Sequence, residues 1–234
     1  NNVVNLAEMR MLARKRVPKA VFDYVDGGAN DELAYARSQS VYSRVEFRAR
    51  VLRDVSKINL TAYVAGEKCA LPIIFAPTGY TRMMHYEGEV MVAKICEENK
   101  LIYNLSTMGT TSSVEIGQQV PNVRRWFQLY LWRDRTQSLK FIEEARSAGF
   151  EGLMLTVDTA VGGIKWRDMR NGLTVPPKIR LKTFLDMALK PKWWFNLLTT
   201  APLEFATFRN FNKPLSEIAA TVFDPAVTFE DVKW

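Results

Sequence analysis

The sequence contains few of the residues that build metal centres or disulfide frameworks. Its 234 residues include one histidine and two cysteines. The lone His85 cannot anchor a metal cluster by itself, so we expect no metal site and a structural role for His85. Cys69 and Cys96 lie in apolar surroundings without CxxC or Cys/His spacing. This context favours reduced core thiols over a disulfide.

Long apolar runs and clusters of like charge are also absent. No apolar run is long enough to span a membrane, and no cleavable signal is recognisable, although peripheral attachment stays open. The net charge of +7 suits an anionic substrate, a nucleotide phosphate, an acidic lipid surface or RNA. The basic residues are dispersed rather than gathered in a run, so nucleic acid is not an expected partner.

With 47% hydrophobic and 24% charged residues, the chain can bury a substantial core. From residue 71 onward, short apolar runs alternate with segments of helical character. Continuous apolar runs suit strands covered on both faces, and the helices between them make parallel crossovers. The predicted strands are 71–77, 101–107, 125–131 and 152–159, and the predicted helices are 18–25, 87–100, 112–120 and 136–148.

Polar residues gather where these predicted strands end. They are Thr78, Ser106, Thr107, Gln128, Tyr130, Thr156 and Asp158. In a β/α barrel the carboxyl ends of the strands form one rim, where ligands bind. A doubly wound sheet would collect polar groups in the same place, so this pattern alone leaves both folds open.

Six segments, taken together and in order, resemble the FMN-dependent 2-hydroxy-acid dehydrogenases and oxidases. This family includes glycolate oxidase, L-lactate dehydrogenase, mandelate dehydrogenase and the flavin domain of flavocytochrome b2. The segments are PKAVFDYVDGGAND at 18–31, FAPTG at 75–79, HYEGE at 85–89, LSTMGTTSSV at 105–114, WFQLY at 126–130 and LTVDT at 155–159. One such segment is weakly specific, but six in order are highly specific.

The resemblance implies an α/β fold of the TIM (β/α)8 barrel family. Four strand–helix units make only about half of such a barrel, so we expect the first four units after an N-terminal helical segment, in a truncated record. The expected organisation is one partial domain over 1–234. It comprises a lead-in at 1–70, the four units at 71–179 and a variable segment at 180–220.

The resemblance also implies FMN as cofactor and a role for each matching residue. Tyr24 matches the tyrosine that holds the substrate carboxylate, and Tyr130 matches the catalytic tyrosine beside the substrate hydroxyl. The expected cofactor-binding residues are the backbone of Ala76, Pro77, Thr78 and Gly79 and the side chains of Ser106, Gln128 and Thr156. Neutral hydroxyls and amides can satisfy the ring carbonyls and N–H groups of a flavin. Without the resemblance, Tyr24 would be read as a core tyrosine and Ser106 as a strand-terminal hydroxyl.

One position departs from the family pattern. In the stretch 159–171 (TAVGGIKWRDMRN), relatives carry a substrate-binding arginine where Lys165 stands here. Lysine keeps the positive charge but loses the planar two-point grip on a carboxylate. We expect Lys165 to bind substrate. The alternative is a solvated loop lysine.

Between residues 180 and 211 the strand–helix rhythm fails, and lysines stand beside tryptophans and aliphatic residues. Such a mixture suits the lipid–water boundary. The segment resembles the loop that attaches membrane-bound mandelate and lactate dehydrogenases. We expect peripheral membrane contact through 190–211, with an aromatic patch that packs on another subunit as the alternative.

The expected reaction is oxidation of an (S)-2-hydroxy acid, lactate-like, to the 2-oxo acid. In the family a base removes the hydroxyl proton while the α-hydrogen passes to flavin N5. The resemblance places the base histidine, a substrate arginine and a flavin-facing lysine beyond residue 234. Expected partners are the hydroxy acid, a quinone or other electron acceptor, and further copies in a homo-oligomer. The expected location is the cytoplasm or the surface of the cytoplasmic membrane. An oxygen-using oxidase and a non-catalytic half-barrel that binds a partner or itself remain alternatives.

Overall fold

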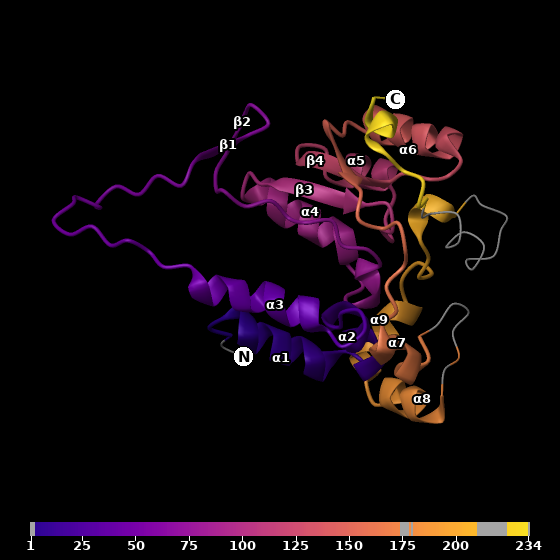
Figure 1. Ribbon diagram of the computed structural model, residues 1–234. Helices are drawn as coiled ribbons and strands as arrows, with labels where there is room; N and C mark the ends of the chain where they lie inside the picture. The colour runs from indigo at the N-terminus through magenta and orange to yellow at the C-terminus, as the bar shows by residue number, and fades with distance from the viewer. Residues whose placement is uncertain (1–2, 174–177, 179, 210–223, 234) are drawn as a thin grey trace.

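The computed structural model describes residues 3–173, 178, 180–209 and 224–233 (Figure 1). Its helices are α1 (Leu6–Arg16), α2 (Lys19–Asp26), α3 (Leu33–Val41), α4 (Gly88–Glu98), α5 (Ser113–Gln119), α6 (Arg135–Ser147), α7 (Trp166–Asn171), α8 (Leu181–Ala188) and α9 (Pro191–Leu198). Its strands are β1 (Ala62–Val64), β2 (Glu67–Cys69), β3 (Ile102–Ser106), β4 (Arg124–Tyr130) and β5 (Gly152–Thr156). Short 3-10 helices lie at Tyr42–Arg44, Thr81–Met83, Ala206–Phe208 and Phe229–Val232.

The central sheet consists of β3, β4 and β5 in that order, and all three strands are parallel. These strands confirm the second, third and fourth predicted runs. The prediction of a regular first strand at 71–77 is wrong, because this segment forms only one parallel bridge, from Ile74 to Ile102. Pro72 and Pro77 have no N–H to donate, and the Phe75 N–H donates to the Ile102 carbonyl at 3.2 Å as part of this bridge.

Helices α4, α5 and α6 cover one face of this sheet (Figure 1). Side chains alternate between the two faces of a strand, and those directed to the helices are apolar. Leu105 and Leu129 from the sheet pack with Cys96, Ile116 and Phe141 from the helices. Two of these helices begin with a side-chain cap: Ser112 and Glu115 form a capping box at α5, and Asp134 accepts from the Thr136 N–H at α6. Cys69 and Cys96 are buried and unpaired, which confirms the expectation of free core thiols.

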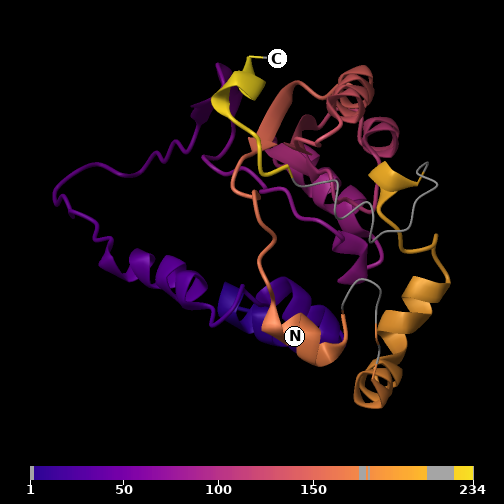
Figure 2. The same cartoon turned by 45° about the vertical axis from the view of Figure 1, so that its right-hand side comes forward.

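A second helical layer joins the start of the chain to residues far along it. Helices α1 and α2 lie beside α7, α8 and α9 in both views (Figures 1 and 2). Their shared core contains Val21, Phe22 and Met83, with Trp193 packed against it. Between this layer and the sheet, residues 45–61 run outward as an exposed extended segment (Figure 2).

Two features of the structure lie outside the sequence predictions. The strands β1 and β2 form an antiparallel hairpin with Val64 opposite Glu67. Its two-residue turn places Ala65 and Gly66 at positive φ, as expected for a tight hairpin. The variable segment folds into α8 and α9 rather than an irregular loop.

The aromatic residues of the variable segment are divided between the surface and the core. Phe205 and Phe208 pack with Tyr80 and Trp132 instead of facing solvent. Phe211 lies outside the described residues. Within the described part of the variable segment, the exposed large apolar side chains therefore lie on α8 and α9 or at the junction between them. No helix among the described residues is both long and apolar enough to cross a bilayer.

The helix-covered face of the sheet should dominate stability. Leu129 is buried near the end of β4, the central strand of the sheet, so Leu129→Ala should lower the free energy of unfolding by about 2–5 kcal/mol. Leu139→Ala, at a half-exposed position of α6, is the matched control and should cost about 0.5 kcal/mol or less. Urea denaturation measures both, and equal losses would contradict this assignment of the core.

Candidate active site

The sheet face opposite the helices carries polar side chains at its carboxyl end. Ser106 lies directly opposite Gln128, and Tyr130 lies directly opposite Thr156. Parallel pairing in this register brings side chains from three strands onto one face. The structure therefore gathers Ser106, Gln128 and Thr156, as the sequence predicts.

Hydrogen bonds join these three side chains into a continuous chain. The Ser106 hydroxyl donates to Oε1 of Gln128 at 3.1 Å, and the Thr107 backbone N–H donates to the same oxygen at 3.1 Å. Nε2 of Gln128 donates to Oγ1 of Thr156 at 2.7 Å. Gln128 is only 2% exposed, so its amide orientation is fixed by partners on both neighbouring strands.

The segment 76–79 reaches the same end of the sheet. The Tyr80 N–H donates to the Met108 carbonyl at 2.8 Å, which ties this segment to the loop after β3. A Cβ on Gly79 would stand 2.8 Å from Cβ of Met108, so the close approach requires glycine. Thr78 is exposed. Four stretches that the sequence assigns to the cofactor thus lie around one end of the sheet.

The residues predicted to bind substrate form a neighbouring cluster. Burial raises the pKa of Tyr24, and Asp168, Tyr80 and Tyr130 raise it further through their negative charge when ionised. Burial also raises the pKa of Tyr130, with a contribution from Asp158. Both phenols therefore remain neutral hydrogen-bond donors at physiological pH.

Lys165 belongs to this cluster and is not a freely solvated loop lysine. Its Nζ donates to the Tyr24 carbonyl at 3.0 Å and lies 5.0 Å from the centroid of the Tyr24 ring. A lysine ammonium has three donors, so two remain for other acceptors. Burial raises the pKa of the nearby Asp168 carboxyl, whereas the Lys165 charge lowers it.

An ionic clamp between α2 and α7 holds Tyr24 in this position, and sequence reasoning missed it. Arg167 contacts Asp26 at 3.0 Å and also pairs with Glu32. Nδ2 of Asn171 donates to Asp23 at 2.7 Å. The partners are more than 130 residues apart in the chain, so no local spacing could have revealed them.

Asn104 is a second residue that sequence reasoning missed. It lies on β3 two residues before Ser106 and therefore on the same face. Its Nδ2 contacts Sδ of Met154 at 3.3 Å, and its Oδ1 is buried without a hydrogen-bond partner among the described residues. The signal in the sequence was a lone amide in the apolar run 101–107.

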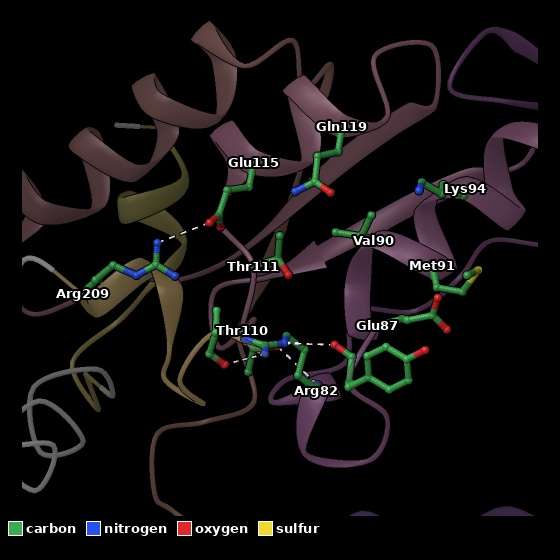
Figure 3. A pocket seen from close by; sticks show the side chains of 12 residues that line it. Arg82, Glu87, Val90, Met91, Lys94, Thr110, Thr111, Glu115, Gln119 and Arg209 are labelled. Atoms are coloured by element: carbon green, nitrogen blue, oxygen red, sulfur yellow. Dashed lines mark hydrogen bonds and ion pairs between the residues drawn. The ribbon is translucent and has the colours of Figure 1, made fainter. Parts of the chain in front are cut away.

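A hollow of about 340 Å³ lies away from these clusters, between α4 and α5 (Figure 3). Arg82, Thr110 and Glu115 are among its lining residues, and none of the predicted cofactor or substrate residues takes part. At the predicted site, Ser106 and Gln128 are buried, and Thr156 lines a small cavity of about 30 Å³ together with Leu131 and Asp224.

The side chains at this end of the sheet fit a flavin ring. Ser106, Gln128 and Thr156 offer hydroxyl and carboxamide groups, and no charged side chain is among them. An isoalloxazine presents carbonyl and N–H groups that such neutral partners satisfy. The orphaned Oδ1 of Asn104 adds a buried acceptor on the same face. These residues could hold the ring.

A parallel sheet with helices on its outer face and polar groups at its carboxyl end is typical of the β/α-barrel class, and this chain carries part of such a barrel. Residues 13–234 match the family described as FMN-dependent dehydrogenase. The chain belongs to this family.

Similar proteins include hydroxy-acid enzymes of several kinds. A putative L-lactate dehydrogenase of Mycobacterium tuberculosis is 42% identical over 231 residues, covering 99% of this chain and 56% of that protein. 2-Hydroxyacid oxidase 1 of Homo sapiens is 32% identical over 224 residues, covering 95% of this chain and 57% of that protein. The chain thus spans a little more than half the length of these relatives.

Among solved structures, the monotopic membrane protein (S)-mandelate dehydrogenase superposes with a TM-score of 0.92 at 28% identity. The match covers 100% of this chain and 63% of that chain. The polar cluster, the α2–α7 clamp and the helices α8 and α9 therefore all lie within the superposed region.

The raised pKa of Tyr24 predicts a late ionisation. Tyr24→Phe should remove a phenolate transition above the ordinary tyrosine value of about 10. Because the folded state holds this proton more tightly than the unfolded state, the native protein should lose stability as the pH rises above that value, and Tyr24→Phe should lose less. Ultraviolet titration of both proteins measures the transition. If Tyr24→Phe instead removes a phenolate transition at or below about pH 10, the burial of the Tyr24 phenol is contradicted.

Proposed function

We propose that this protein acts in the FMN-dependent oxidation of a small (S)-2-hydroxy acid, lactate-like, to the 2-oxo acid. The observation that supports this proposal most is the hydrogen-bonded row from Ser106 through Gln128 to Thr156 beside the cluster of Tyr24, Tyr130 and Lys165. A neutral row suits the flavin, and the adjacent cationic and phenolic groups suit a carboxylate with a neighbouring hydroxyl.

The substrate roles follow from charge and protonation. The Tyr24 phenol stays protonated and can donate to the substrate carboxylate, while Lys165 supplies the opposite charge. Tyr130 stays protonated and can donate to the oxygen of the substrate hydroxyl. FMN supplies the acceptor for the α-hydrogen and its electron pair. His85 is exposed beside Glu87 at 3.6 Å, and we assign it no part in proton removal.

Lys165 has a further effect in this proposal. Because one of its donors is bound to the Tyr24 carbonyl, it can approach a carboxylate with a point charge but not with two parallel hydrogen bonds. The substrate carboxylate would then be oriented chiefly by Tyr24. A relative with arginine at this position would share that task between the two side chains.

We also propose that α8 and α9 contact a membrane surface. Their exposed large apolar side chains include Phe184 (60% exposed), Leu189 (78%) and Leu198 (76%). Lys182, Lys190 and Lys192 flank them, and this combination favours the lipid–water boundary. The superposed mandelate dehydrogenase is described as monotopic. A lipid-phase quinone would be a suitable electron acceptor for a protein attached in this way.

The cofactor proposal predicts specific losses of FMN affinity. Thr156→Val and Gln128→Leu each remove side-chain hydrogen-bonding groups worth about 1 kcal/mol or more, so each should weaken FMN binding roughly five- to tenfold or more. Quenching of flavin fluorescence measures the affinity. Gln118→Leu, on the exposed side of α5, is the control and should leave it unchanged.

Circular dichroism must show that the variants remain folded. Anaerobic addition of an (S)-2-hydroxy acid should then bleach the bound flavin. A folded protein that never retains FMN would instead support a half-barrel that binds a partner or itself. Retention of FMN with unchanged affinity in both variants would refute the cofactor assignment of Gln128 and Thr156.

The membrane proposal predicts that apolar substitutions on α9 release the protein from lipid. Phe195→Ser and Leu198→Ser each remove an exposed apolar side chain, worth about 1.5–3 kcal/mol when buried in lipid. Each should therefore weaken sedimentation with phosphatidylcholine vesicles about tenfold or more. Leu139→Ser, on α6, is the matched control. Equal effects of all three substitutions would rule out contact through α9.

A further inference from the structure

A cavity of about 550 Å³ lies between the end of α1, the 3-10 turn at Thr81–Met83 and helix α9. It is separate from the candidate active site, since none of the predicted cofactor or substrate residues lines it. Five permanently cationic side chains do line it. They are Lys15, Arg16, Arg82, Lys190 and Lys192.

Among the described residues, these positive charges lack a carboxylate partner, although Glu87 contacts His85 of the same lining at 3.6 Å. No aspartate or glutamate lines the cavity, and within the described part of the chain none of the five cations makes an ion pair. Hydrogen bonds to carbonyl oxygens orient some of them, such as that from Nζ of Lys190 to Lys15 at 2.7 Å. A concave surface lined by one sign of charge concentrates ions of the opposite sign.

A nearby basic hollow of about 400 Å³ provides an internal comparison. It is lined by Arg10, Lys19 and Arg167, but Asp23 and Asp26 are in the same lining. Arg10 pairs with Asp26 at 2.5 Å, and Lys19 pairs with Asp23. Arg14 and Arg170 also line that hollow, so its two carboxylates compensate its positive charge only in part. The cavity beside α9 has no carboxylate at all among the described residues of its lining.

Arg82 strengthens the case because its charge is buried. Its guanidinium donates to neutral oxygens, namely the carbonyls of Tyr86 (3.1 Å), Pro202 (3.3 Å) and Ala201 (2.6 Å) and the hydroxyl of Thr200 (2.9 Å). Arg82 stands in the wall between this cavity and the hollow of Figure 3. A buried cation without a counter-ion is unfavourable, and an anion in the cavity would provide one.

The other wall of the cavity is apolar and continues onto the exposed surface of α8 and α9. Trp193 is fixed there by a hydrogen bond from its Nε1 to the Met83 carbonyl at 2.8 Å. Leu189 and Leu197 also line the cavity, and Leu189 is one of the most exposed apolar residues of the chain. An occupant could therefore place an anionic group among the cations and an apolar part along the helices.

We propose that this cavity binds the phosphate of an anionic phospholipid headgroup, with the acyl chains along the apolar surface of α8 and α9. The proposal rests on the membrane contact proposed above and adds a choice of lipid to it. It is independent of FMN binding, which uses other residues.

The test compares vesicles of phosphatidylcholine alone with vesicles that also contain phosphatidylglycerol. The wild-type chain should bind the anionic vesicles more tightly. Arg16→Gln with Lys192→Gln removes two exposed cations of the cavity, each worth about 1 kcal/mol near an anionic surface. This pair should reduce the preference for anionic vesicles roughly 30-fold and leave FMN binding unchanged.

The matched control is Arg50→Gln with Lys57→Gln. It makes the same change in net charge on the exposed segment 45–61, which extends away from α8 and α9 in both views (Figures 1 and 2). This control should keep most of the anionic preference. If both double variants lose the preference for anionic vesicles equally, the overall charge of the protein causes the preference, and the headgroup site in this cavity is refuted.

Two further outcomes complete the test. If all proteins bind phosphatidylcholine vesicles and none prefers phosphatidylglycerol, membrane contact stands and the headgroup cavity is refuted. Inorganic phosphate, titrated by calorimetry without vesicles, tests the other source of the same chemistry. If the double variant Arg16→Gln with Lys192→Gln abolishes saturable phosphate binding while the wild type shows no preference for anionic vesicles, the cavity is assigned to a soluble phosphate compound. That result would refute the phospholipid proposal.

Discussion

The parallel register of β3, β4 and β5 is the constraint on which the candidate site depends. A shift of one residue in β4 would turn Gln128 toward the helices and bring an apolar neighbour to the polar face. The buried amide of Gln128 opposes such a shift, because it accepts from Ser106 and Thr107 on one side and donates to Thr156 on the other. Breaking this row would leave buried donors and acceptors unpaired. The free-energy penalty for an unpaired buried group exceeds the net stabilisation that its hydrogen bond provides. The same groups that would meet a flavin thus also specify the sheet.

A second constraint brings the start of the chain to the sheet. Tyr24 sits on α2, far from β4 in sequence, and reaches Tyr130 because Arg167, Asn171 and Lys165 tie α2 to the segment after β5. The carboxylates of α2 lie next to cations of α7, so the contact depends on paired charges rather than on apolar burial. Arg167 pairs with Asp26 and Glu32 at the same time, and a network of several charges stabilises a contact more than an isolated surface ion pair does. Tyr24 is thereby held by Arg167 and Asn171, which would not touch the substrate, and by Lys165, which would.

The sequence was sufficient for the features that depend on local periodicity. Alternating apolar runs and helical stretches predicted β3, β4, β5 and the helices between them within a few residues, and strand-end polarity predicted the row at Ser106, Gln128 and Thr156. It failed where the outcome depends on distant partners. The segment 71–77 has the composition of a strand, but its prolines lack the N–H groups of a regular ladder, and it forms a single parallel bridge. Phe205 and Phe208 resemble the surface aromatics before them, but Phe208 is buried against Trp132 and Phe205 is partly buried against Tyr80. The α2–α7 clamp and the unbalanced charge beside α9 combine residues that no short window contains.

The chain segment that leaves β5 connects the candidate site to the proposed membrane surface. It begins at Thr156 in the polar row, passes Lys165 beneath Tyr24, forms α7 and then supplies α8 and α9. Because α7 is clamped to α2, and Trp193 of α9 is bonded to the Met83 carbonyl, this segment is held at both ends against the same helical layer. A lipid surface bound by α8 and α9 would therefore have a fixed position relative to the carboxyl end of the sheet. An electron acceptor dissolved in that lipid would then approach the candidate site from a constant direction. The proposed membrane contact and the candidate site are thus joined through the chain that follows β5.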